Sequence, residues 1–445
     1  MLDKPSSLSS KLVPPLAIFF VGFLLSYPLI VEDLVGMSDD FFAHYGWGMQ
    51  FADAFEEGDY YPRWMPLDHH GFGSPAFFYY PPLTYQAIGL VSLICGDHWL
   101  AMKLVALASF VATGLIGWRF GARLGGGRWS VVLGLALMTA PMYLLVLYRY
   151  ASWSWFAAFP WMLALLYAAV FPGRRQFWVD PWVTIAAAGL LLTHVLTGFI
   201  TIICLVALGR EGFWQRARSL ALAAGLAGIY LYPALTMMGL IDSQAWVSGE
   251  HLDWWRNFVF PVWGSIRFGL DLDPYHWGIP SIALMLGVAA AVSRQSSSRG
   301  LLAVWGLAMF MASELSYPLW ALLGPLEFVQ FPFRFIYLAS AAGLAACFSA
   351  TFSSRGRAAQ GSLAASSAAG LALFLYAWTL FMTPLVPEHA HPLVHDARPE
   401  YRLQGPKART PFERPRHQLI GEGLTAVSLL VLVAACLWQR PLRSQ

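Results

Sequence analysis

Acidic and imidazole side chains gather in one stretch of this 445-residue chain, directly after its first apolar segment. Asp39 and Asp40 come first. A carboxylate pair here could act as a general base, bind a divalent cation through oxygen, or orient a sugar hydroxyl. His44 follows Asp40 by four residues, which is one turn if the stretch is helical, so it could hydrogen-bond the acidic pair or a donor phosphate. A solvated acid pair and an ordinary interfacial histidine are the simpler alternatives.

The same stretch contains Asp68, His69 and His70, followed by the aromatic run FFYYPP. These are metal-ligand residue types, but no partner stands at helical or hairpin spacing, so they are a weak indication of zinc. Polar residues at the mouth of a membrane span usually line a wet cavity. We therefore expect His69 and His70 to contact substrate and not a metal.

Further candidates lie at the ends or breaks of later apolar segments. Arg149 lies in the turn YRYAS, and the planar guanidinium of arginine matches phosphate oxygens. His194 interrupts an apolar run within THVLTG. Anchoring at the membrane interface, or a purely structural hydrogen bond, is the alternative for each of these residues. The remaining substrate-binding candidates, in two later polar segments, are Glu250, His251, Gln330 and Arg334.

The composition predicts a polytopic membrane protein. The chain is 58% hydrophobic and only 12% charged, with a mean hydropathy of +0.55, and its polar stretches are too short for a separate soluble domain. The net charge of +3 does not indicate a nucleic-acid partner, because Lys and Arg mostly flank apolar segments. All four cysteines lie in apolar runs without metal or disulfide spacing.

Basic loops predict how the chain crosses the membrane. A span needs roughly 20 apolar residues, and short loops rich in Lys and Arg stay in the cytoplasm. The N-terminus, with Lys4 and Lys11, is then cytoplasmic, and Val13–Val31 leads outward. Keeping the later basic loops inside requires that Leu83–Cys95 lies along the outer face and that Trp182–Leu208 turns back at THVLTG. Alternatively, both segments cross once, which leaves two arginine-rich loops outside.

The predicted fold is an all-α bundle of about 11–13 helices, on the span-length rule, without a large soluble domain. Trp129–Leu147 and Leu220–Ile241 are expected to be single spans. Residues 1–445 form one transmembrane domain in this prediction, with outer segments at 32–82, 242–276 and 384–418. Juxtamembrane helices are expected in the first of these. The long polar segments all lie on the outer face, so any chemistry is expected there.

Several of these stretches resemble known families. SDDFFAH resembles the acidic first outer loop of the GT-C superfamily, integral membrane glycosyltransferases that use polyprenyl-phosphate-linked sugars. More narrowly, DDFFAH, GFGSPAFFYYPPLTY, APMYLLVLYRYAS, LLTHVLTG and PLEFVQFPFRF are similar to a bacterial membrane protein family labelled 6-pyruvoyl-tetrahydropterin-synthase-related. Nothing in these motifs suggests pterin chemistry. Their order over residues 37–337 carries the resemblance more than any single motif.

The resemblance implies a GT-C-like bundle with its site on the outer face. Asp40 or Asp39 would be the catalytic base, and Asp40 a candidate ligand of a divalent cation, Mg²⁺ or Mn²⁺. Arg149, His194 and Arg334 would line the donor site. One departure from the pattern is that the YRYAS turn is followed by SWSWFAAF, where a further acid is expected. A metal held between two loops is therefore in doubt unless an acid of the second outer segment substitutes.

The expected activity is transfer of a sugar from a polyprenyl-phosphate donor to a lipid or glycan acceptor. The expected place is the periplasmic face of the bacterial cytoplasmic (inner) membrane, in contact with membrane lipids. A lipid or glycolipid transporter or flippase, and a non-catalytic envelope scaffold, are the alternatives. A transporter should place charges along a path to both faces and often has an internal repeat, whereas this chain concentrates polar residues on one side.

Overall fold

The computed structural model describes residues 8–36, 39–69, 71–172, 178–243, 247, 253–260, 278–292, 299–351, 360–362, 364–371, 382–384 and 416–438. Two short strands, β1 (Leu34–Gly36) and β2 (Met382–Pro384), form one antiparallel pair. Helices make up nearly all other regular structure in these residues, as the composition predicts for a polytopic membrane protein.

The described α-helices are named by their order along the chain. In order, they are α1 (Leu8–Val31), α2 (Asp39–Glu56), α3 (Ala76–Tyr79), α4 (Leu83–Cys95), α5 (His98–Arg123), α6 (Ser130–Met138), α7 (Pro141–Tyr148), α8 (Trp153–Val170), α9 (Pro181–Thr193), α10 (Val195–Leu205), α11 (Phe213–Leu226), α12 (Gly228–Thr236), α13 (Gly278–Val292), α14 (Arg299–Ala312), α15 (Tyr317–Leu322), α16 (Phe335–Thr351) and α18 (Arg416–Trp438). Residues 360–362 and 364–371 are also helical and are called the 360–371 helix below. Single 3-10 turns are η1 (Gly127–Trp129), η2 (Val206–Leu208), η3 (Met238–Leu240), η5 (Trp254–Arg256), η8 (Glu314–Ser316), η9 (Gly324–Val329) and η10 (Pro332–Arg334).

Five helices in the described residues are long and apolar enough to cross a membrane, and two bent helix pairs bring the number to seven. Five shorter apolar helices accompany them, so the predicted all-α multi-pass bundle is confirmed. The spans differ in burial: the window that starts at Pro332 is 94% buried, whereas that of α18 is only 17% buried. The α16 span therefore lies at the centre of the bundle, and α18 lies at its periphery.

The expected single span Trp129–Leu147 is bent by 41° between α6 and α7, and whether it crosses the membrane as one span stays a prediction. Pro141 stands at the start of α7, where its missing N–H leaves no unmade helix bond. Thr139 donates its hydroxyl to the carbonyls of Leu135 and Ala136, 3.1 and 3.3 Å away. Both features end α6 one turn before the proline.

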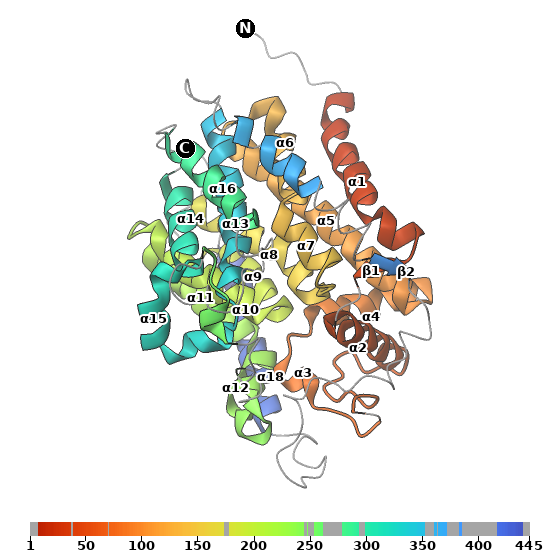
Figure 1. Ribbon diagram of the computed structural model, residues 1–445. Helices are drawn as coiled ribbons and strands as arrows, with labels where there is room; N and C mark the ends of the chain where they lie inside the picture. Colours follow the sequence, from red (N-terminus) through yellow and green to blue (C-terminus); the bar gives the residue numbers. More distant parts are fainter. Residues whose placement is uncertain are drawn as a thin grey trace.

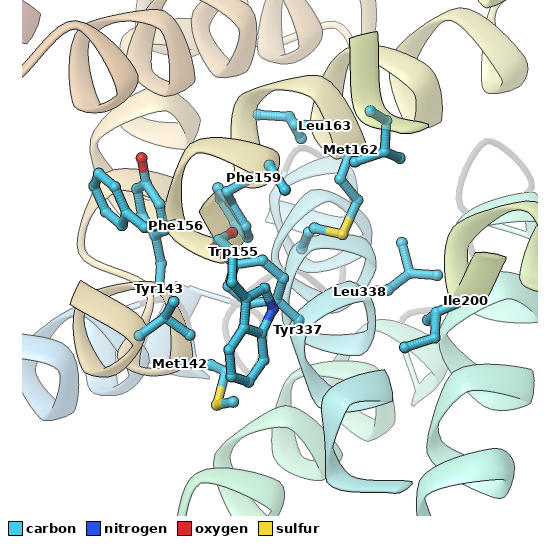
Figure 2. Packing of buried hydrophobic residues seen from close by; sticks show 14 of the residues in the cluster. Met142, Tyr143, Trp155, Phe156, Phe159, Met162, Leu163, Ile200, Tyr337 and Leu338 are labelled. Carbon is cyan, nitrogen blue, oxygen red and sulfur yellow. Dashed lines mark hydrogen bonds between the residues drawn. The ribbon is translucent and has the colours of Figure 1, made fainter. Parts of the chain in front are cut away.

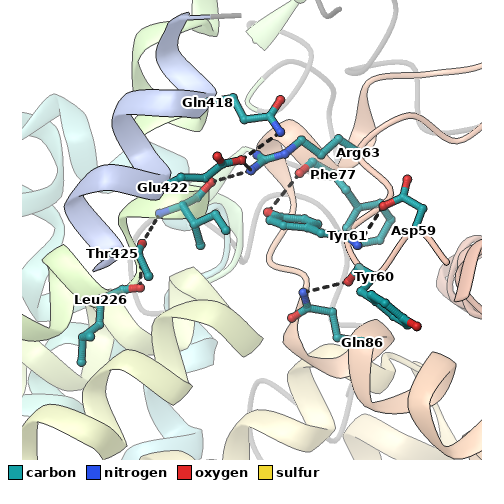
Figure 3. A network of polar contacts seen from close by, with 11 residues as sticks. Asp59, Tyr60, Tyr61, Arg63, Phe77, Gln86, Leu226, Gln418, Glu422 and Thr425 are labelled. Carbon is teal, nitrogen blue, oxygen red and sulfur yellow. Dashed lines mark hydrogen bonds and ion pairs between the residues drawn. The ribbon is translucent and has the colours of Figure 1, made fainter. Parts of the chain in front are cut away.

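The expected single span Leu220–Ile241 is bent more sharply, since α11 and α12 meet at 77°, and whether the pair crosses the membrane as one span stays a prediction. A side chain from α18 occupies this break: Thr425 donates to the Leu226 carbonyl at 3.1 Å and accepts from the Ile229 amide at 2.7 Å. Gly228 and Gly421 let the helices meet at backbone distance, since a Cβ on Gly421 would lie 2.5 Å from the Gly228 carbonyl oxygen. Figure 3 shows Thr425 directed at Leu226. A partner 200 residues away thus bends the helix.

The expected break in Trp182–Leu208 is confirmed. α9 ends at Thr193, His194 has an extended backbone (φ −156°, ψ 98°), and α10 begins at Val195. The His194 ring caps α10, because its Nδ1 accepts from the Thr197 amide at 3.2 Å. Whether α9 with α10, or α4, crosses the membrane stays a prediction.

Segments far apart in the sequence meet at one end of the bundle. β1 follows α1 and pairs with β2, with Val35 opposite Thr383. Tyr79 in α3 donates its hydroxyl to the Met237 carbonyl at 2.8 Å. In Figure 1, α2, α3 and α12 lie at the lower end of the view, whereas the starts of α1 and α6 lie at the upper end. Described residues that border the two later polar segments thus contact the first one, and whether the three segments share one face of the membrane stays a prediction.

An ion pair between a half-exposed aspartate and a buried lysine holds the end of α1 to α5. Asp33, which follows α1, pairs with Lys103 and accepts from Trp99 Nε1 at 2.7 Å. Partial burial by itself raises the pKa of Asp33, but the hydrogen bonds from Lys103 and Trp99 and the lysine charge lower it below its ordinary value. Among the described acids that pair with a charged residue on another helix, Asp33 lies nearest to the end of the first span.

Stacked aromatic rings fill the centre of the molecule (Figure 2). The ring of Tyr143 in α7 lies between Phe156 and Phe159 of α8, with ring centres 4.4 and 4.3 Å away. Tyr337 of α16 packs against Phe159 at 4.8 Å. This core holds the ends of α7, α8 and α16 in fixed relation, and those ends carry the polar residues described next.

Candidate active site

The turn between α7 and α8 is the structural centre of the candidate site. The amide of Arg149 closes α7 by donating to the Leu145 carbonyl at 2.8 Å. Ala151 has a left-handed backbone (φ 50°), which a non-glycine residue rarely adopts. Ser152 is the N-cap of α8, and its carbonyl accepts from the Phe156 amide at 2.9 Å. Such strained turns persist where the surroundings over-determine them, often at functional sites.

His44 joins the acidic segment to this turn. Asp39 and Asp40 begin α2, so the expected juxtamembrane helix is confirmed. One turn later, His44 is 1% exposed, and its Nε2 lies 3.1 Å from the Ser152 hydroxyl. Its Nδ1 shares a short hydrogen bond with the Tyr85 hydroxyl. Because residues four apart share a helix face, the half-buried Asp40 lies on the face of α2 that meets the turn.

The aromatic run after the acidic segment also reaches this turn. The Tyr80 hydroxyl lies 2.5 Å from that of Ser154, near the start of α8. Tyr80 packs on Trp47 of α2 at 4.9 Å, and Trp47 packs edge-on against His44 at 6.0 Å. Both ends of the first outer segment are therefore held at the N-terminus of α8.

Trp155 joins the other predicted residues. Its ring is stacked on His194, with centroids 6.1 Å apart and planes inclined by 13°. The guanidinium carbon of Arg334 lies 5.5 Å from the same ring, and Tyr150 lies 5.6 Å from it. The Tyr337 hydroxyl donates to the Trp155 carbonyl at 3.2 Å, and Figure 2 shows the two residues side by side. The structure thus brings His194 and Arg334 to one indole.

Arg334 is held in place by its own turn. Its Nη1 donates to the Val329 carbonyl at 2.7 Å and to Gln330 Oε1 at 3.1 Å. The guanidinium also lies 4.7 Å from the centre of the Phe331 ring. Gln330 has a left-handed φ of 65°, the second strained non-glycine residue in this region. A cation oriented in this way is suited to a phosphate, because its planar fork has a defined direction.

Asp68 has a structural place in the loop before α3. Its carboxylate accepts from Trp47 Nε1 and Gln50 Nε2, both at 3.2 Å, and from the Ser74 hydroxyl at 2.5 Å. Burial raises its pKa, although these hydrogen bonds and the charge of His69 act in the opposite direction. Asp68 thus organises the loop around Trp47. His69 follows it, half-buried and with a left-handed φ of 51°.

The other predicted residues divide into two groups. The backbone places Asp39 at the start of α2 and Arg149, half-buried, at the end of α7, next to the strained Ala151. The residues that lie outside the described part of the chain are His70, Glu250 and His251.

Sequence reasoning missed the residues that join the site: Ser152, Ser154 and Trp155. All three lie in SWSW, the stretch noted for lacking an acid. The available signal was a serine N-cap followed by an indole one turn later, which is typical of a helix start that packs on a neighbour.

A divalent cation fits only in part. Asp40 supplies a carboxylate near the turn, but no group of three His, Cys, Asp or Glu residues is close enough to hold a metal within the described part of the chain. Because a cation of this kind takes several oxygen ligands, the described residues alone do not form a full ligand set. No step is therefore assigned to a metal.

No protein family matches the chain, and no curated protein does. Among solved structures, the chain is similar to a cryo-EM structure of the arabinofuranosyltransferase AftD from mycobacteria, with a TM-score of 0.50 and 18% sequence identity over 84% of this chain. A mutant of the same enzyme aligns with a TM-score of 0.46 and 17% identity. The chain spans only 28% of the length of the first AftD chain. It therefore shares the fold of the part of AftD that it matches, while the narrower pterin-labelled resemblance has no support from these comparisons.

Proposed function

We propose that the protein is a GT-C-type glycosyltransferase that uses a polyprenyl-phosphate-linked sugar. It would transfer the sugar to a lipid or glycan acceptor at the periplasmic face of the bacterial cytoplasmic membrane. One observation carries the proposal: Trp155 holds His194 and Arg334 together, three residues after the Ser152 that contacts His44. The residues proposed to bind phosphate and the helix that carries the proposed base therefore both contact the start of α8.

The cationic half would bind the donor phosphate. Arg334, with Arg149 at the preceding turn, would balance the charge that grows on phosphate as the glycosidic bond breaks. Phosphate is a good leaving group, so fixed positive charge matters more than protonation of the leaving oxygen. The indole of Trp155 would keep the guanidinium plane fixed, which lowers the cost of reorganisation during the reaction.

The acidic half would activate the acceptor. An acceptor hydroxyl attacks the anomeric carbon, a new C–O bond forms, and the bond to phosphate oxygen breaks. Asp40 or Asp39 would take the hydroxyl proton as general base. His44 is a positioning residue in this scheme, because its bonds to Tyr85 and Ser152 fix α2 against the turn.

The test is transfer by the purified protein in lipid nanodiscs, with a panel of radiolabelled polyprenyl-phosphate sugars and a lipid acceptor extract. Release of polyprenyl phosphate together with a labelled product is the expected result. Asp40→Asn and Asp39→Asn should show which acid is needed, with a loss on the order of a hundredfold for the base. Asp53→Asn is the matched control, since Asp53 lies on the exposed side of the same helix.

Persistence of full transfer in both Asp39→Asn and Asp40→Asn, with normal expression, would refute the base assignment. Movement of intact labelled lipid across a sealed vesicle, without cleavage, would instead support a flippase. Loss of activity after chelation, with recovery on adding Mg²⁺ or Mn²⁺, would establish that the reaction needs a divalent cation. The described residues supply only part of the ligand set for such a cation.

A further inference from the structure

A cavity lies apart from the candidate active site, at the other end of α6 and α16. It has a volume of about 410 Å³, within the usual size range of ligand sites, and lies between α6, α16 and the 360–371 helix. Its walls include Trp129, Val132 and Ala136 from η1 and α6, Phe348 from α16, and Ala364 from the 360–371 helix. The turn that carries the active-site residues is at the other end of α7, so the two sites are separate.

Helix geometry explains why the cavity forms. The 360–371 helix touches the end of α6 at Gly370, where a Cβ would lie 1.8 Å from the Thr139 carbonyl oxygen. Lining residues on both helices precede that contact in sequence: Val132 and Ala136 on one, and Ala364 on the other. The helices thus meet at Gly370 and enclose the cavity between this contact and their N-terminal ends. In Figure 1, α6 lies at the upper end of the molecule, opposite α2 and α3.

The cavity is open at its edge and apolar at its base. Trp129 and Val132 are 55% and 40% exposed, whereas Ala136 and Phe348 are 5% and 2% exposed. A hydrocarbon chain that enters past Trp129 and Val132 would therefore end against the buried Ala136 and Phe348. Such a slot fits a narrow, flexible hydrocarbon chain better than a folded peptide.

The mouth carries a positive charge. Arg128 is exposed, and its guanidinium carbon lies 5.2 Å from the centre of the Trp129 ring, which lines the cavity. Arg128 belongs to the basic loop after α5 that the sequence predicts to be cytoplasmic. Tryptophan and arginine side by side are typical of the level of lipid headgroups.

We propose that this cavity binds one acyl chain of an anionic phospholipid from the inner leaflet, with the headgroup phosphate at Arg128. Hydrocarbon gains little by leaving lipid for protein, so preference comes from the shape of the slot and the charge at its mouth. One cationic side chain near an anionic headgroup should give an enrichment on the order of fivefold over a zwitterionic lipid.

The test is native mass spectrometry of the detergent-purified full chain with equal amounts of phosphatidylglycerol and phosphatidylcholine carrying the same acyl chains. The wild type should retain phosphatidylglycerol about fivefold more than phosphatidylcholine. Ala364→Trp, which fills the slot from an exposed position, should reduce retention of both lipids on the order of tenfold. Arg128→Gln should abolish the preference while leaving retention of phosphatidylcholine unchanged.

Ala365→Trp is the matched control, because Ala365 is also exposed, lies next to Ala364 and does not line the cavity. Equal lipid retention by Ala364→Trp and Ala365→Trp would overturn the site. Equal retention of the two lipids by the wild type would overturn the role of Arg128. Displacement of phosphatidylglycerol by an equal amount of undecaprenyl phosphate would overturn the proposed occupant, since the slot would then prefer an isoprenoid chain.

Discussion

Replacing Arg334 by glutamine should abolish most turnover without unfolding the protein. The guanidinium donates two hydrogen bonds, to Val329 and Gln330, and its carbon lies 5.5 Å from the Trp155 ring and 4.7 Å from the Phe331 ring. Removing one fixed group that balances developing charge typically lowers kcat by about 10²–10³, or roughly 2.7–4 kcal/mol of transition-state free energy. We expect the same range for Arg334→Gln, with kcat affected more than KM because the charge develops as the bond breaks.

Arg334→Lys separates charge from shape. Lysine keeps the positive charge but lacks the planar fork, so a loss of about tenfold, equal to about 1.4 kcal/mol, is expected. The assay is release of polyprenyl phosphate with kcat and KM measured separately, beside the melting temperature in the same detergent. Arg218→Gln is a matched control, since Arg218 also donates to a carbonyl, that of Trp178, but lies on an exposed face.

Two results would refute the charge argument. In the first, Arg334→Gln retains at least a third of the wild-type kcat at an unchanged melting temperature. In the second, the lysine and glutamine variants are equally impaired, which would show that shape alone matters. A melting temperature that falls in both Arg334 variants would indicate a structural role. In that case the kcat of Arg334→Lys would be as low as that of Arg334→Gln.

Three further predictions concern stability and are measured by thermal unfolding. His44→Ala removes the imidazole that hydrogen-bonds to the buried hydroxyls of Tyr85 and Ser152, so a loss of about 0.5–1.5 kcal/mol in the free energy of unfolding per hydrogen bond is expected; an unchanged melting temperature would contradict this. The pKa of Asp33 is lowered in the folded state, so its stabilisation is present above the ordinary value of about 3.9 and is lost as pH falls through the lower folded value. Asp33→Asn should remove that part of the acid dependence, and identical pH profiles for variant and wild type would refute it. Gly370→Ala should lower the melting temperature because its Cβ would lie 1.8 Å from the Thr139 carbonyl oxygen, whereas Gly306→Ala, with open space around it, should not; equal effects would contradict the close contact.

Local features of the sequence predicted local features of the structure well. The acidic pair begins a helix, as its spacing to His44 suggested. The helix break falls on His194, because a polar ring can cap the next helix in place of the missing backbone bonds. Both are decided within a few residues, so a single sequence contains the information.

Long-range features were missed for a different reason. The bend between α11 and α12 depends on Thr425, about 200 residues later, which accepts the freed amide and donates to the freed carbonyl. Asp68 was expected to line a cavity, yet it organises its own loop because three donors surround it. Neither outcome follows from hydropathy, since both depend on which polar groups meet after the helices pack.

The sequence by itself determined the class of protein and the kinds of residue available for chemistry. Apolar segments of span length require helices in a membrane, because backbone groups there must bond within their own segment. Only the tertiary structure decided which of those residues meet. His194 lies in a helix break and Arg334 in a 3-10 turn 140 residues later, and a tryptophan with no charge of its own brings them together. Packing of large rings is specific to the folded core, so the residue that unites the site is visible only once the chain has folded.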